Sequence, residues 1–190
     1  MEINRAVRGF LLIGSLFLVI LMAWVLGSGS KEDAPEILKK IPVFEFPLIG
    51  QSGVITRHQF KGRALVVSYF NPDCSHCQML ADGVGKRSYR LVYKVGGKST
   101  RVAWLWVTRF DEDQAWDFMK QYGLAGRPDV WLAADREGTF YGAFGDMHVP
   151  SIYVFDAGGR YLQTVYDQPS YGDVLQILAG KKVNKPKKSR

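Results

Sequence analysis

The distribution of apolar residues divides the chain into a charge-free stretch near the amino terminus and a longer region where short apolar runs alternate with polar ones. The stretch from Gly9 to Leu26, GFLLIGSLFLVILMAWVL, holds eighteen residues without a charge. A helix of that length spans about 27 Å, close to the roughly 30 Å hydrocarbon core of a bilayer. The run therefore predicts an uncleaved transmembrane helix, with a cleaved signal peptide and a buried core helix as the alternatives.

Charged residues on either side of this run predict its orientation. Arg5 and Arg8 precede it, whereas Lys31 on the far side is offset by Glu32 and Asp33. Because cytoplasmic flanks carry the excess of cations, we expect everything after the span on the extracytoplasmic (periplasmic) side of the cell (inner) membrane. The expected divisions are a cytoplasmic terminus (1–8), a transmembrane anchor (9–26), a tether (27–40), a globular domain (41–180) and a basic disordered tail (181–190).

Beyond the tether, runs typical of strands alternate with runs typical of helices. The run 64–70, ALVVSYF, is apolar on both faces, as in a central strand of a covered sheet. Further strands are expected at 43–46, 54–56, 102–107, 130–133, 151–155 and 161–166. Helices are expected from about Cys74 toward Tyr93, at 111–122 and at 171–179. This order predicts one α/β domain with a mixed central sheet flanked by helices.

The charge of the chain is unevenly distributed, which limits what it indicates. The formal net charge is +7, but the last ten residues alone carry six cations and no anion. The first eight residues carry a net charge of +1, so residues 9–180 are neutral overall. A basic face for nucleic acid is therefore not expected on the globular domain.

The chain has two cysteines, Cys74 and Cys77, in a Cys-x-x-Cys motif that follows the 64–70 run. Unpaired N–H groups and the helix dipole favour a thiolate at the start of a helix, and residues three apart share a helix face. Closing so short a loop stabilises a fold little, so the pair indicates a redox-active disulfide, with no other cofactor expected. The alternatives are a structural disulfide and a zinc site, although zinc would need two further histidine ligands and no metal is expected.

His76 lies between the two thiols and has two interpretations. It is either a solvated turn residue or a donor whose imidazole stabilises the Cys74 thiolate. Asp73, directly before Cys74, acts in the opposite direction because a nearby carboxylate disfavours a thiolate.

The segment 41–78, IPVFEFPLIGQSGVITRHQFKGRALVVSYFNPDCSHCQ, resembles the opening of the TlpA/ResA-like branch of the redoxin (AhpC/TSA) superfamily. The resemblance extends over 41–179 and implies a thioredoxin-like fold with an added amino-terminal β-hairpin. It implies a protein thiol-disulfide oxidoreductase in which Cys74 is the nucleophile, Cys77 the resolving thiol, and Val149-Pro150 a cis peptide that docks the substrate cysteine. The implied partners are cysteine-containing client proteins and a thiol-disulfide electron donor or acceptor in the membrane or extracytoplasmic space.

Three positions depart from the pattern of these relatives. Asp73 stands where thioredoxins have tryptophan before the first cysteine, and Ser68 stands where they bury an aspartate. Leu80 stands where TlpA/ResA-like proteins often have glutamate. Both familiar proton acceptors for the resolving thiol are therefore missing from the sequence.

Three other functions remain as alternatives to disulfide exchange, of which one is a redox-inactive adhesion or scaffold domain. A thiol peroxidase requires threonine three residues before its reactive cysteine, where this chain has Asn71. A Sco-like copper-binding protein or metallochaperone combines a thiol pair with a distant histidine, for which His148 is the candidate. Sco-like proteins, however, space their cysteines more widely, as Cys-x-x-x-Cys.

Overall fold

The computed structural model describes residues 38–87, 92–95 and 98–184 of the chain. The chain divides into two units, Met1–Glu36 and Ile37–Arg190, and every described residue belongs to the second. The expected cytoplasmic terminus, the transmembrane anchor, most of the tether and residues 185–190 of the basic tail lie outside the described residues. Within the described residues, no helix is long and apolar enough to cross a membrane.

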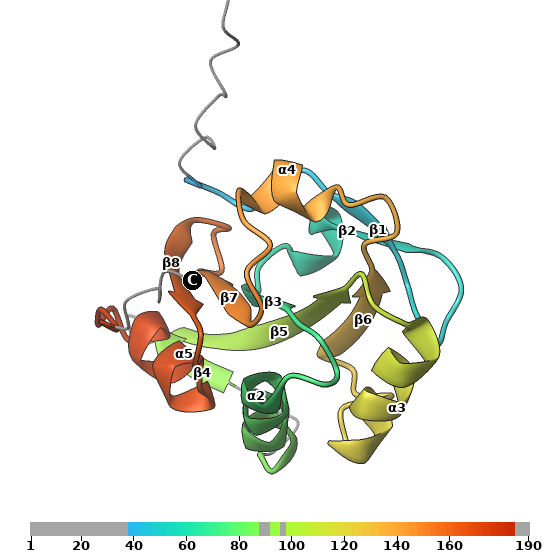
Figure 1. Cartoon of the computed structure of the whole chain (residues 1–190). Coiled ribbons are helices and arrows are strands. Elements are labelled where there is room, and N and C mark those ends of the chain that lie inside the picture. The colour runs from blue at the N-terminus through green and yellow to red at the C-terminus, as the bar shows by residue number, and fades with distance from the viewer. Residues whose placement is uncertain (1–37, 88–91, 96–97, 185–190) are drawn as a thin grey trace, which may run out of the picture. The chain divides into compact units, whose positions relative to one another are not determined.

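A mixed sheet forms the centre of this unit (Figure 1). Its spatial order is β4-β5-β3-β7-β8, and β6 also pairs with β5. Strands β3, β5 and β6 run parallel, whereas β7 is antiparallel to β3, β8 to β7 and β4 to β5. The strands are β3 (Ala64–Tyr69), β4 (Val92–Val95), β5 (Lys98–Thr108), β6 (Val130–Ala134), β7 (Ser151–Phe155) and β8 (Tyr161–Tyr166).

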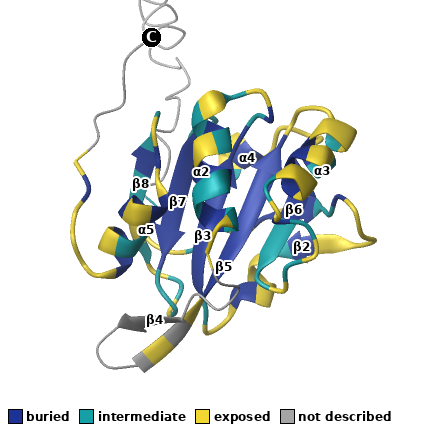
Figure 2. Cartoon of the chain, turned by 90° about the horizontal axis from the view of Figure 1, so that it is seen from below, coloured by how far each residue is buried: buried dark blue, intermediate teal, exposed yellow. Residues whose placement is uncertain are grey.

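Both faces of the sheet are covered, which explains why β3 is apolar throughout. In Figure 1 the helices α2 (Ser75–Gly85), α3 (Glu112–Gln121) and α5 (Tyr171–Leu178) lie on one face. The opposite face carries α4 (Phe140–Phe144), the hairpin of β1 (Glu45–Pro47) and β2 (Val54–Thr56), and the 3-10 helix η1 (Arg57–Phe60). All six residues of β3 are buried, as Figure 2 shows for the central strands.

Each face has its own hydrophobic core, because successive strand residues point to opposite sides. On the side of α2, Val66 and Trp106 pack with buried residues of the helices such as Leu80. On the other side, aromatic rings dominate, and Phe140 stacks on Phe144 with ring centroids 4.3 Å apart. The remaining rings of that aromatic cluster include Phe44, Phe46, Phe60, Tyr69 and Tyr153.

Most of the elements expected from the sequence are present, including the amino-terminal hairpin, in which β1 pairs antiparallel with β2. One expectation was wrong: α2 ends at Gly85 and does not continue toward Tyr93. Residues 92–95 instead form β4, which pairs antiparallel with β5 so that Val95 lies opposite Lys98. In the hairpin, the backbone N–H and C=O groups of this segment bond to β5 and extend the sheet by one strand. A longer α2 would have left that edge of β5 without a partner.

Helix α2 packs against the end of α3 through Gly85. A Cβ atom built on Gly85 would lie 2.1 Å from the carbonyl oxygen of Tyr122, the residue that ends α3. Because backbone cannot yield as a flexible side chain does, we expect Gly85→Ala to destabilise the fold by about 2 kcal/mol, measured by denaturant unfolding. Gly83→Ala is the matched control, since its Cβ would meet Tyr171 at 3.5 Å, an ordinary contact. That variant should be neutral or stabilising by up to about 1 kcal/mol. Equal effects of the two substitutions would contradict the close approach.

Candidate active site

The carboxyl ends of the parallel strands meet at one edge of the sheet, and the cysteines lie there. Phe70 donates its backbone N–H to the carbonyl oxygen of Val107 (3.1 Å), so the chain leaves β3 beside the end of β5. On its other side, Tyr69 at the end of β3 pairs with Ser151 at the start of β7. The cysteine motif therefore follows one strand, and the Val149-Pro150 segment precedes its neighbour, at the same edge.

Cys74 is the N-cap residue of α2, with extended backbone angles of φ −78° and ψ 116°. A tight turn delivers it there: Asp73 donates its N–H to Oδ1 of Asn71 (2.9 Å), and Cys74 donates its own to the Asn71 carbonyl (3.1 Å). The Gln78 side chain donates to the carbonyl of Pro72 (2.9 Å), which joins the turn to the second turn of the helix. The thiol is half-buried and uses no hydrogen bond to cap the helix. Its sulfur therefore lies at the positive end of α2 with access to solvent.

Cys77 is fully buried beneath Cys74, on the side of the helix that faces the sheet. Burial, and then the hydrogen bond between its side chain and Cys74, raise the pKa of the Cys77 thiol well above its usual range. Both cysteines are free thiols in this structure. The two sulfurs thus differ sharply in environment: one is accessible at a helix start, and the other is held protonated in the core.

His76 and Asp73, the residues expected to affect the Cys74 thiolate, flank Cys74, whereas Ser68 and Leu80 stand where relatives have proton acceptors. His76 is half-buried in the first turn of α2, and Asp73 is exposed. Ser68 is fully buried in β3, and its hydroxyl has no hydrogen-bond partner among the described residues. Leu80 is buried in the core formed by α2 and the sheet.

The Val149-Pro150 peptide bond is cis, which confirms the prediction from the sequence. Pro150 is buried, whereas Val149 is half-buried and packs against both hydrophobic cores. The carbonyl oxygen of Pro150 accepts a hydrogen bond from the backbone N–H of Asp167 (3.1 Å). The role of these two residues in docking a substrate cysteine stays a prediction.

A hydrogen-bonded pair beside this segment, His148 with Asp167, was not predicted from the sequence. Nε2 of His148 lies 2.8 Å from Oδ1 of Asp167, and the two side chains are 14% and 23% exposed. From the sequence, His148 is a candidate copper ligand only. The contact arises from the pairing of β7 with β8, in which Ser151 lies opposite Tyr166, so no local sequence signal marks His148 and Asp167 as neighbours. Within the described residues, no group of three or more His, Cys, Asp or Glu side chains is arranged to hold a metal ion.

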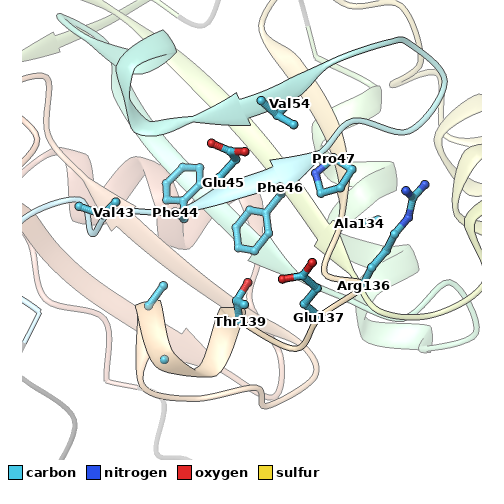
Figure 3. Close-up of a pocket in the computed structure, with 12 residues that line it drawn as sticks. Val43, Phe44, Glu45, Phe46, Pro47, Val54, Ala134, Arg136, Glu137 and Thr139 are labelled. Carbon is cyan, nitrogen blue, oxygen red and sulfur yellow. The ribbon is translucent and has the colours of Figure 1, made fainter.

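A cavity of about 610 Å³ lies away from the thiols, between the β1–β2 hairpin, the end of β6 and α4. Figure 3 shows Phe46 pointing from β1 toward Thr139, with Glu45 and Glu137 at its margin. Neither cysteine lines it, and it lies on the face of the sheet opposite α2. The thiol pair therefore lies at the carboxyl edge of the sheet and outside this cavity.

Comparisons with known proteins agree with this geometry at the level of the fold. No protein-family model matches the sequence, and the curated proteins include no match. Among solved structures, a secreted Mycobacterium tuberculosis disulfide oxidoreductase homologous to E. coli DsbE is 15% identical, with a TM-score of 0.56 over 72% of this chain and 95% of that chain. DsbF of M. tuberculosis is 17% identical, with a TM-score of 0.57 over 74% and 96% of the two chains. A thiol:disulfide interchange protein of the thioredoxin family from Chlorobium tepidum is 17% identical, with a TM-score of 0.51 over 74% and 94%. The chain therefore has a thioredoxin-like α/β fold.

Proposed function

We propose that the protein is a membrane-anchored, extracytoplasmic thiol-disulfide oxidoreductase that exchanges disulfides with protein thiols through Cys74-Ser75-His76-Cys77. The observation that carries the proposal is the asymmetry of the pair, in which Cys74 is half-buried at the start of α2 and Cys77 is fully buried and hydrogen-bonded to it. A sulfur at a helix amino terminus is the one favoured as a thiolate, and the thiolate is the attacking species.

The reaction proceeds in two exchanges. The Cys74 thiolate attacks one sulfur of a client disulfide, which forms a mixed disulfide and releases the other client sulfur as a thiolate. Cys77 then loses its proton and attacks the Cys74 sulfur, which forms the Cys74–Cys77 disulfide and releases the second client thiolate. The client gains two electrons and the protein loses two, and the same steps in reverse oxidise a client dithiol.

Two further features support the wider proposal. The charge-free run 9–26, with Arg5 and Arg8 before it, supports an anchor that leaves the thiol pair outside the cytoplasm, where disulfides persist. The hairpin β1–β2 ahead of the central strand β3 supports a relationship to the TlpA/ResA-like branch of the redoxins. In this proposal cysteine-containing proteins are the clients, and they dock on the backbone of Val149 and Pro150.

Equilibration with glutathione tests this function directly. The full-length protein, in detergent, is incubated at graded ratios of reduced to oxidised glutathione, and its thiols are trapped with a maleimide and counted by mass. We expect Cys74 and Cys77 to be lost together in one two-electron transition, at a potential between about −270 and −120 mV, the range of dithiol exchange proteins. A pair that never forms a disulfide, or one that stays oxidised below about −300 mV, would contradict the proposal.

The same equilibrium tests His76. If its imidazole stabilises the Cys74 thiolate, His76→Ala makes the couple more reducing by about 30 mV for each tenfold loss of that stabilisation. Asp73→Ala should shift the potential the other way, because it removes a carboxylate adjacent to the thiolate. Neither substitution alters the start of α2. An unchanged potential in both variants would therefore show that the helix start alone stabilises the Cys74 thiolate.

A further inference from the structure

Asp167 contacts both residues that flank Val149. Its carboxylate oxygen Oδ1 lies 2.8 Å from Nε2 of His148, and its backbone N–H donates to the carbonyl oxygen of Pro150 at 3.1 Å. Asp167 follows β8, nineteen residues beyond His148, so these two contacts join two separate loops at the carboxyl edge of the sheet. The segment from His148 to Pro150 is therefore held at both of its ends.

The two partners of this contact are themselves held in place. The backbone N–H of His148 donates to Oδ1 of Asp146 (2.9 Å), and the His148 ring meets Tyr166 edge-on with centroids 5.7 Å apart. Asp167 has φ +61°, and it is the one non-glycine residue with positive φ in the part of the chain that the structure describes. Because that conformation is unfavourable for a residue with a side chain, it persists where surrounding contacts determine it.

We propose that Asp167 is a positioning residue that fixes the backbone at Val149 for an extended client segment, acting through His148 and Pro150. This inference rests on the proposed function, because it concerns how that same site binds its client. An extended peptide that adds to an exposed backbone edge gains its affinity from main-chain hydrogen bonds, which require donor and acceptor to be held at fixed positions. With Asp167 in place, the Val149 backbone is ordered before the client arrives.

The location and burial of the pair favour this role over a general contribution to folding. His148 and Asp167 lie in the loops that border the cysteine edge, outside the two hydrophobic cores. The pair is mostly shielded from solvent, so water competes less for its hydrogen bond than at an exposed pair such as Arg136 with Glu112. Loss of the pair should therefore loosen the segment from His148 to Pro150 and leave the environment of the two thiols unchanged.

Two disulfide substrates of different size separate docking from exchange chemistry. The full-length protein, in detergent, is assayed with the protein disulfides of insulin and with bis(2-hydroxyethyl) disulfide, which has no peptide backbone to pair with Val149. Asp167→Gly removes the carboxylate and tolerates the positive φ, whereas Asp167→Asn keeps both an acceptor oxygen and that conformation. His148→Ala removes the partner, and His148→Gln retains a donor. Glu112→Gln, which weakens the exposed ion pair between α3 and Arg136 after β6, is the matched control.

We expect Asp167→Gly and His148→Ala to raise KM for insulin about tenfold with kcat changed less than about threefold, and to leave the rate with bis(2-hydroxyethyl) disulfide within about twofold. Asp167→Asn and His148→Gln should have a KM for insulin close to that of the parent protein, and Glu112→Gln should match the parent with both substrates. An unchanged insulin KM, or an equal loss with both substrates, would overturn the inference.

If Asp167→Gly does not fold, the comparison of His148→Ala with His148→Gln decides it in the same way. Absence of exchange with either substrate in the unmodified protein would instead overturn the proposed function, and the inference with it.

Discussion

Replacing Cys74 by serine is expected to abolish disulfide exchange, with a loss of at least about a thousandfold in the rate with insulin disulfides. Cys74 is the accessible sulfur at the start of α2, whereas Cys77 is completely buried beneath it. The removal of Cys74 therefore leaves no sulfur that a client disulfide can reach. The measurement is the initial rate of insulin reduction with excess dithiol, compared with the parent protein.

Cys77→Ser is the matched variant and should behave differently. It retains the attacking thiol, so it should form a mixed disulfide with a client peptide that accumulates and resists release. Alkylation of the reduced parent protein near neutral pH should likewise label Cys74 well before Cys77. If Cys77 reacted first, or if Cys74→Ser kept the parental rate, the roles of the two cysteines would be reversed.

Release of the client from the mixed disulfide is expected to accelerate about tenfold for each pH unit, or about a hundredfold between pH 7 and 9. Burial, together with the hydrogen bond to Cys74, raises the pKa of the Cys77 thiol far above this interval. Below the pKa of a thiol, its thiolate fraction grows tenfold per pH unit, and only the thiolate attacks. The sign is therefore an increase with pH, and burial persists when Cys74 is bonded to a client.

Single-turnover kinetics measure this step, because a chromogenic peptide disulfide reports attack and release as separate phases. The second phase should carry the tenfold dependence and should be missing from Cys77→Ser at every pH. A release rate that stays constant from pH 7 to 9 would show that another group removes the Cys77 proton. Such a group would contradict the isolation of this thiol in the core.

The strands were predictable from the sequence because a sheet covered on both faces requires uninterrupted apolar runs. Residues 64–70 and 151–155 have that pattern, and the structure places them side by side at the centre of the sheet. The position of the thiol pair was predictable for a related reason. Asn71 and Pro72 end the buried strand, so the chain has to leave the sheet before the next helix starts. That turn places Cys74 at the start of the helix.

Other elements had weaker signals. The sequence predicts a helix from Cys74 toward Tyr93, whereas residues 92–95, with two valines and a tyrosine just before a Gly-Gly pair, have the composition of a hairpin strand. Helix α4 spans five residues, too few for helical periodicity to show. The contact between His148 and Asp167 depends on the register of β7 and β8, which includes a shift at Val154 and Phe155. Side chains brought together by such pairing have no signature in local sequence.

The burial of Cys77 also determines the kinetic order in which two substrates can use this protein. Donor and acceptor must both react at the Cys74 sulfur, since the other sulfur lies in the core. They cannot occupy that atom together, so the first product has to leave before the second substrate binds. Steady-state rates should therefore follow a double-displacement pattern, with parallel lines when reciprocal rate is plotted against reciprocal client concentration at several donor concentrations. An excess of either substrate would then compete with the other for the same atom.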